Sequence, residues 1–138
     1  MPLTQSELDT FLSQPHIAVV ATASAAGKPH AMPIWYLWRD GKVLFQTGPD
    51  SKKMRNLRAN HRITVVVDSK VAPYKVVVIE GTALERPGDK VLARQTAIHY
   101  LGEKQGARYV ERSTEPGTLV EVTPEKIISW DYARESNP

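Results

Sequence analysis

The sequence contains no cysteine, no long hydrophobic run and few aromatic residues. The absence of cysteine from all 138 residues excludes disulfides, cysteine-ligated zinc or iron–sulfur sites and a thiol nucleophile. The N-terminal segment MPLTQSELD also lacks the basic and apolar regions of an export signal, so we expect a cytoplasmic protein. The clearest apolar run, Val76 to Ile79, is far shorter than the roughly 20 residues that cross a bilayer, and we expect no membrane partner.

Familiar catalytic and nucleotide-binding patterns are missing as well. The sequence has no G-x-S-x-G, H-E-x-x-H, P-loop or G-x-G-x-x-G pattern. The four histidines are scattered, and no pair has the spacing of a local metal site, so we expect no bound metal. We interpret His30 and His61, which lie beside strand starts, as structural or surface residues.

The small positive charge is concentrated in one segment. Residues 52–62 contain five basic residues and no acid, whereas the rest of the chain has 13 basic and 15 acidic residues. A +5 segment on a body of −2 favours a phosphate or carboxylate partner, although a solvated helix face remains open. The segment is short and lacks surrounding exposed aromatics, so we expect no nucleic-acid partner.

Apolar patterns and turn signals predict a chain built mainly of strands. The capping box at Thr4 and Glu7 predicts a first helix over about 4–13, and Asp50 and Asn60 are natural ends for a second. Asp40-Gly41 predicts a tight hairpin. We expect strands at residues 16–22, 29–38, 43–47, 63–67, 76–84, 118–122 and 127–130. We expect further helices at 87–101, with Val91, Leu92, Ile98 and Leu101 buried, and within 102–116.

The hairpin order of these elements predicts a mainly β fold. We expect one domain over residues 1–138, an antiparallel barrel of six to seven strands with short peripheral helices. Several strands are apolar on both faces, so one face fills the barrel while the other needs a second covering surface. A homodimer supplies that surface, and the alternative is cover by the peripheral helices.

The most informative local pattern is the run from Thr47 to Leu57. It places the hydroxyl groups of Thr47 and Ser51 and the ammonium groups of Lys52 and Lys53 at the N-terminal end of the second helix, which we call the helix mouth. The first amide hydrogens of a helix lack partners and its dipole is positive there, so two lysines conflict with the dipole and a bound anion resolves the conflict. We therefore predict a phosphate site, with an exposed basic helix as the alternative.

A set of motifs extends this pattern along nearly the whole chain, from about Ser6 to Asp131. The motifs are Gly27-x-Pro29-x-x-Met32-x-Ile34, Phe45-x-Thr47, Ser51-Lys-Lys53-x-x-Asn56-Leu57, Val76-x-x-x-Glu80-Gly81 and Thr123-Pro124 to Trp130-Asp131. In this order and spacing they resemble the pyridoxamine 5′-phosphate oxidase-like split β-barrel superfamily. Within it, the chain is most similar to the branch of reductases that use the deazaflavin coenzyme F420.

The resemblance implies a homodimeric split barrel with two cofactor sites at the subunit interface. By similarity, Ser51 and Lys53 hold the cofactor phosphate, Arg55 lies near its tail, and Tyr74 covers the cofactor of the partner subunit. The strand around Met32 lines the ring system, partly through its backbone. The candidate cofactor-binding residues are Met32, Pro33, Ile34, Trp35, Thr47, Ser51, Lys52, Lys53, Arg55 and Tyr74. Trp35, Tyr36, Trp38 and Trp130 are also explained by core or interface packing.

Met32 favours coenzyme F420 over FMN, because FMN-binding members commonly carry an arginine at this position. The acidic tail of coenzyme F420 also requires a longer basic track, for which Lys52, Arg55, Arg58 and Arg62 are available. The expected activity is hydride transfer between the deazaflavin and a small electron-poor molecule, with no side chain standing out as acid or base. The alternatives are an FMN-binding oxidoreductase of the superfamily and a non-catalytic binder of flavin- or haem-like planar molecules.

Overall fold

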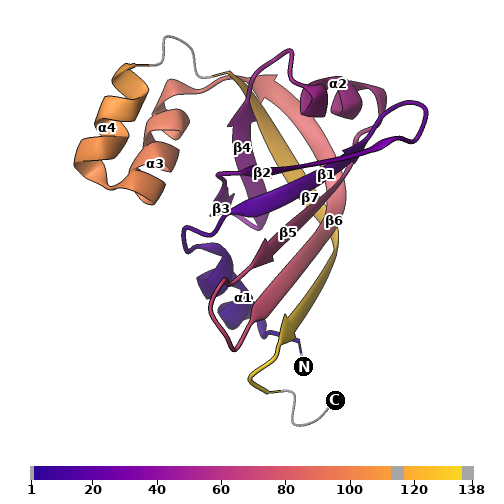
Figure 1. Cartoon of the computed structure of the whole chain (residues 1–138), viewed down its shortest axis with the longest axis vertical. Helices are drawn as coiled ribbons and strands as arrows, with labels where there is room; N and C mark the ends of the chain where they lie inside the picture. The colour runs from indigo at the N-terminus through magenta and orange to yellow at the C-terminus, as the bar shows by residue number, and fades with distance from the viewer. Residues whose placement is uncertain (1, 113–116, 135–138) are drawn as a thin grey trace.

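The central feature of the fold is a curled seven-stranded sheet (Figure 1), seen in a computed structural model that describes residues 2–112 and 117–134. Its strand order is β2-β1-β5-β6-β7-β4-β3, and every neighbouring pair is antiparallel. The long strands β6 and β7 pair along their whole length and join the two halves. The strands are β1 (Ala18–Ala23), β2 (Pro29–Ile34), β3 (Leu37–Arg39), β4 (Lys42–Thr47), β5 (Arg62–Asp68), β6 (Lys75–Pro87) and β7 (Thr118–Asp131). The predicted split barrel is confirmed.

The barrel interior is filled by the alternate side chains of the strands. Valines dominate it because β-branched residues pack well on a pleated surface. Helix α1 (Gln5–Leu12) closes one end with Leu8, Phe11 and Leu12, and the predicted capping box at its start is present. The fully buried strand residues are Val20, Val43, Phe45, Val65, Val67, Val77, Ile79, Val120 and Val122.

The expected strand over residues 29–38 is wrong, because the chain leaves β2 after Ile34 and begins β3 at Leu37. These two strands lie at opposite edges of the sheet. The crossing is fixed by Tyr36, whose side chain is 1% exposed and whose hydroxyl donates to the Leu12 carbonyl at 2.8 Å. One continuous apolar run therefore supplies both edges of the barrel.

The expected break in the last strand is also wrong, because β7 continues through Thr123 and Pro124. Pro124 pairs opposite Gly81, where the register between β6 and β7 shifts. A Cβ on Gly81 would lie 2.2 Å from the Thr123 carbonyl oxygen. Glycine thus allows a close backbone approach, and the bulge accommodates a proline that cannot donate a ladder hydrogen bond.

Helix α2 (Lys52–Ala59) begins one residue later than the sequence suggests. Its N-cap is Ser51 rather than Asp50, and the Ser51 hydroxyl accepts from the Met54 amide at 3.3 Å. The helix ends at Asn60, as predicted, and it buries Met54 and Leu57 in the core. Its mouth therefore opens directly from the end of β4.

Helices α3 (Lys90–Leu101) and α4 (Glu103–Glu111) form a hairpin that stands away from the sheet in Figure 1. Gly106 permits close packing, because a Cβ there would lie 2.6 Å from the Ile98 backbone. The expected burial of Leu92 is confirmed, whereas that of Val91 is wrong, since its side chain is 66% exposed. Ile98 and Leu101 are half-buried, and Ala97 is buried as well. No helix in the described ranges has the length and apolar character needed to span a bilayer.

Candidate functional site

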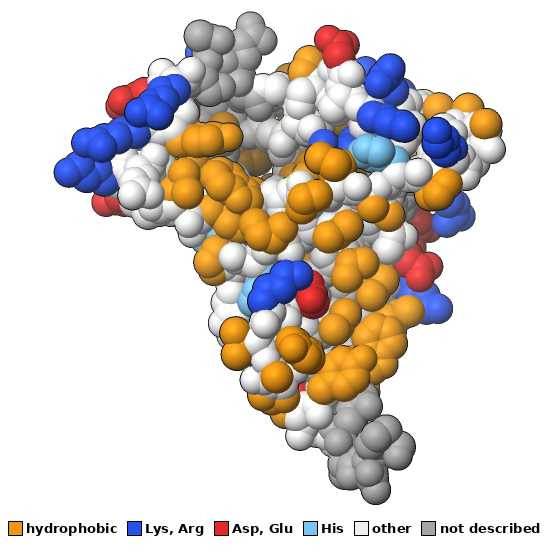
Figure 2. Space-filling model, in the orientation of Figure 1, with side chains coloured by type: hydrophobic (Ala, Val, Ile, Leu, Met, Phe, Trp, Pro, Cys, Tyr) orange, Lys and Arg blue, Asp and Glu red, His pale blue; other side chains and the backbone are white. Residues whose placement is uncertain are grey.

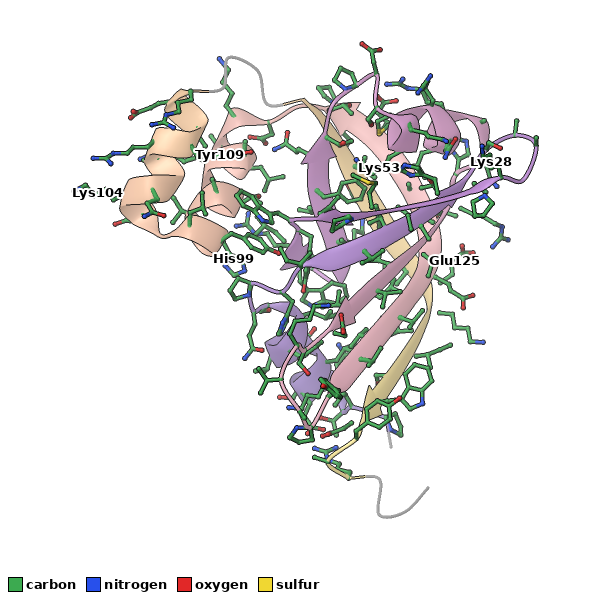
Figure 3. The ribbon with its side chains drawn as sticks, viewed as in Figure 1. Lys28, Lys53, His99, Lys104, Tyr109 and Glu125 are labelled. Atoms are coloured by element: carbon green, nitrogen blue, oxygen red, sulfur yellow. The ribbon has the colours of Figure 1, made fainter. Side chains whose placement is uncertain are left out.

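A hollow lies between the α3–α4 hairpin and α2 (Figure 2). Hydrophobic side chains surround it, and Lys or Arg and His side chains gather toward α2. In Figure 3 Tyr109 of α4 lies on one side and Lys53 of α2 on the other, with β2 between them in this view. The hollow thus combines an apolar wall with a basic end.

Lys53 defines the basic end. It is only 9% exposed, although lysine is almost never buried without a partner. Burial lowers the pKa of its ammonium group, and its Nζ makes no hydrogen bond or ion pair within residues 2–112 and 117–134. An anion beside it would restore the interactions that burial removes.

Two predicted hydroxyl groups lie at the same helix mouth. The Thr47 Oγ1 and Ser51 Oγ atoms are 3.5 Å apart, Thr47 at the end of β4 and Ser51 at the cap of α2. Two side chains and the first turn of the helix therefore converge next to Lys53. The fold brings Thr47, Ser51 and Lys53 together as the sequence suggests.

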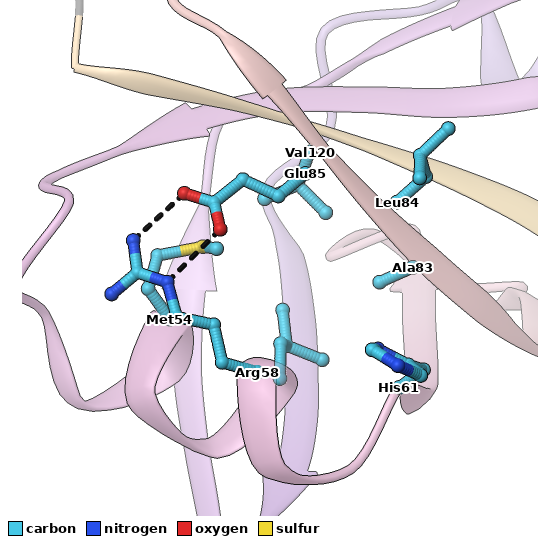
Figure 4. Close-up of a pocket in the computed structure, with 8 residues that line it drawn as sticks. Met54, Arg58, His61, Ala83, Leu84, Glu85 and Val120 are labelled. Carbon is cyan, nitrogen blue, oxygen red and sulfur yellow. Dashed lines mark hydrogen bonds and ion pairs between the residues drawn. The ribbon is translucent and has the colours of Figure 1, made fainter.

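The basic track is shorter than the sequence suggests. Arg58 donates two hydrogen bonds to Glu85, at 2.9 and 2.7 Å, and this pairing raises the pKa of Arg58 and lowers that of Glu85 (Figure 4). The pair borders a separate cavity of about 200 Å³ between α2 and β6. Lys52 and Arg55 are exposed at the start of α2, so they are the basic side chains available beside Lys53.

Strand β2 supplies the predicted ring-binding residues. Met32 is 42% exposed and pairs with the fully buried Val20, so its side chain lies on the inner face of the sheet, as does that of Ile34. Pro33 pairs with Val19 and lies on the outer face. Because β2 is an edge strand, its free backbone groups can bind the polar atoms of a flat ligand.

Trp35 follows β2 and belongs to an aromatic cluster that the sequence did not reveal. Its ring stacks on Tyr100, with centroids 5.0 Å apart and planes 7° apart, and contacts Tyr109 at 5.4 Å. The Tyr100 hydroxyl accepts from the Tyr36 amide at 3.1 Å and donates to the His16 carbonyl at 2.6 Å. Burial raises the pKa of Tyr100. The cluster fixes the hairpin and the end of β2 to each other.

We expect Tyr100→Phe to lower the free energy of unfolding by about 1–2 kcal/mol, because it leaves the Tyr36 amide without its acceptor. Urea denaturation measures this loss. Tyr109→Phe is the matched control, since the Tyr109 hydroxyl makes no hydrogen bond within the described ranges and its ring is 56% exposed. Equal stability of the two variants would show that the Tyr100 hydroxyl does not anchor the hairpin.

Tyr74 lies apart from the other predicted residues. It is 47% exposed in the turn before β6, and its carbonyl accepts from the Tyr132 amide at 3.0 Å, near the far end of β7. Within one subunit the fold therefore does not bring Tyr74 to Lys53. Only a site on another subunit is compatible with its expected role.

Polar residues with buried atoms lie between α2 and the sheet, near Lys53. Asn56 donates to the Thr22 hydroxyl at 3.1 Å, and both side chains are buried. His30, which pairs with Thr22 across β1 and β2, carries a buried Nδ1 atom with no hydrogen-bond partner. Among the described residues no group of three or more metal-ligating side chains is found. Sequence spacing gave no signal for His30, because its environment depends on the contact between α2 and the sheet.

The geometry defines a split β-barrel protein with a basic helix mouth at the end of β4 and a free edge strand, β2. Residues 4–131 match the family model of pyridoxamine 5′-phosphate oxidase. The chain belongs to this family, which confirms the resemblance seen in the sequence.

Solved structures show the same fold at low identity. A conserved hypothetical protein from Mycobacterium tuberculosis is 21% identical, with a TM-score of 0.81 over 99% of this chain and 89% of the other. An F420 reductase is 20% identical, with a TM-score of 0.72 over 87% and 94%. A FAD-binding protein from Mesorhizobium loti is 23% identical, with a TM-score of 0.70 over 94% and 95%. No curated protein shows significant sequence similarity to the chain.

Proposed function

We propose that the protein is a coenzyme F420-dependent oxidoreductase that transfers hydride between the deazaflavin and a small electron-poor organic substrate. The observation that carries this proposal is the largely buried side chain of Lys53 at the mouth of α2, whose ammonium group has a lowered pKa and no partner among the described residues. Membership of a flavin-type oxidoreductase family and the fold shared with an F420 reductase support it. When bound, the coenzyme supplies the hydride chemistry.

The protein's own residues would bind and orient the coenzyme. Lys53, Ser51 and Thr47 would hold its phosphodiester, and the free edge of β2 would hold the ring near Met32. The exposed Lys52 and Arg55 would attract the carboxylates of the tail through interactions of about 1 kcal/mol each. The aromatic wall at Trp35 would keep water from one side of the ring.

Coenzyme F420 fits the basic end better than FMN does. The apolar Met32 lies on the inner face of β2, where an arginine would add a charge for a terminal phosphate. A phosphodiester carries less charge than a terminal phosphate, so the remaining cations suit it. The FAD-binding protein of similar fold keeps a flavin cofactor as the second candidate.

A homodimer is part of the proposal. An apolar row crosses the outer face of five strands and is bordered by Glu80 and Lys126 (Figure 2). Such a face is typical of a protein interface. A second copy would cover it and bring Tyr74 to the partner's cofactor. The row consists of Pro33, Val19, Val66, Val78 and Ile128, paired in this order.

The test is binding and turnover by the purified protein. We expect coenzyme F420 to bind at least tenfold more tightly than FMN in fluorescence titrations. We also expect the reduced coenzyme to be oxidised in the presence of an enone or quinone, followed by its visible absorbance. Tight FMN binding without F420 binding would instead support the FMN enzyme. Tight F420 binding without turnover across a substrate panel would support a carrier.

A further inference from the structure

His30 lies beside the basic end of the hollow, although the sequence suggests a structural or surface role for it. It stands opposite Thr22 in the β1–β2 pair, on the inner face of the sheet. Thr22 accepts a hydrogen bond from Asn56 of α2. Asn56 and Lys53 are three residues apart on one buried face of this helix. A short chain of contacts thus links His30 to Lys53.

Both residues carry polar groups without partners, and the one on His30 is buried. The Nδ1 atom of His30 is buried and makes no hydrogen bond, and the ammonium group of Lys53 has no counter-ion in the described ranges. Leaving a buried polar group unsatisfied costs about 1–3 kcal/mol, and more if the group is charged. One negatively charged ligand that reached both residues would satisfy the buried His30 atom and give Lys53 a counter-ion.

The missing ligand must be an acceptor with negative charge. The Lys53 ammonium can only donate, and a histidine donates from Nδ1 when its proton lies on that nitrogen. A phosphate-type group offers several acceptor oxygens to both donors, and a negative charge to the ammonium. A cation is disfavoured, because Lys53 would repel it.

We propose that His30 is a ligand of the anion site, and that its Nδ1–H and the Lys53 ammonium bind oxygens of the same phosphate-type group. This deepens the proposed function and rests on it for the identity of the coenzyme. The anion site itself depends only on the two unpartnered groups. Protonation at Nδ1 leaves Nε2 as an acceptor, so the site selects one tautomer of the neutral ring.

Substitutions at His30 can separate the two ring nitrogens. Asparagine places its amide near the position of Nδ1, whereas glutamine places its amide near that of Nε2. We expect His30→Asn to retain binding within about twofold and His30→Gln to weaken it at least fivefold. His61→Asn is the control, since His61 is exposed beside the separate cavity on the β6 side of α2.

Two probes separate this proposal from the proposed function. Inorganic phosphate is titrated while the imidazole signals are followed by NMR, and coenzyme F420 is titrated by fluorescence. We expect phosphate to shift the His30 signals in the wild type but not in Lys53→Met. A phosphate response without F420 binding would support the anion site and reject the coenzyme assignment.

Two results would overturn the proposal. One is an unchanged His30 spectrum at saturating phosphate and coenzyme. The other is equal affinity of His30→Asn and His30→Gln for the coenzyme. A combined His30→Gln and Lys53→Met variant provides a further check. If both residues bind one group, the fold-loss of affinity in the double variant should be smaller than the product of the fold-losses in the two single variants. Thermal unfolding of each variant verifies that the fold is intact.

Discussion

Lys53→Met should weaken binding of the coenzyme at least tenfold while making the ligand-free protein more stable. A hydrogen bond from a charged donor to phosphate contributes about 1.5–3 kcal/mol, and tenfold corresponds to about 1.4 kcal/mol. Methionine fills nearly the same volume without the partly desolvated charge, so we expect a gain of about 1 kcal/mol in the free energy of unfolding. Fluorescence titration and urea denaturation measure the two effects.

The pH dependence of stability provides a second readout for Lys53. Burial lowers the pKa of its ammonium group in the folded protein, whereas the unfolded chain keeps the ordinary value near 10.5. Between these two values the unfolded state binds more protons, so stability rises with pH in that interval. The stability gap between Lys53→Met and the wild type should therefore narrow as the pH approaches 10.5. Affinity for the anion should fall over the same interval.

Lys52→Met is the matched control, because it removes the same charge one residue earlier, at an exposed position. A screened surface charge contributes up to about 1 kcal/mol, so we expect a loss of about two- to fivefold and no gain in stability. Equal losses in the two variants would mean that overall charge, rather than the ammonium group of Lys53 in particular, attracts the coenzyme. An unchanged affinity in Lys53→Met would place the phosphate elsewhere.

The helix mouth could be predicted because its signals are local. Thr47, Ser51 and Lys53 lie within seven residues, and the switch from strand to helix between them is visible in the sequence. The choice between Asp50 and Ser51 as N-cap was not predictable, since both residue types can cap a helix. The direction in which the chain leaves β4 determines which of the two becomes the N-cap. The burial of Lys53 was equally hidden, because it depends on the packing of α2 against β1, which is distant in the sequence.

The other missed features depend on contacts between distant segments. Tyr100 bonds to a carbonyl 84 residues earlier in the chain, and no local pattern marks this partner. The break between β2 and β3 depends on Tyr36 reaching α1, so the apolar run alone predicted one strand. Arg58 was assigned to the basic track because Glu85, its partner, lies 27 residues away. Sequence patterns thus predicted the start of α2 and its basic side chains, but not which distant residues those side chains contact.

Val78→Glu should abolish the proposed dimer and weaken coenzyme binding with it. Val78 lies within the outer apolar row, between Val66 and Ile128. A two-fold interface contains the same position from both copies, so one substitution buries two unpaired carboxylates. Each costs about 3–5 kcal/mol when desolvated without a partner, and we expect the dimer dissociation constant to rise at least 100-fold.

The control for Val78→Glu is Thr82→Glu, which places the same charge on the same strand and face about 13 Å further along. Thr82 is exposed and pairs with Arg62, so the added carboxylate remains solvated beside a cation. Light scattering and fluorescence titration compare both variants with the wild type. A monomeric Val78→Glu that binds the coenzyme normally would show that each site is complete within one subunit. Loss of the dimer and of binding together would mean that Tyr74, or another residue from the partner, completes the site.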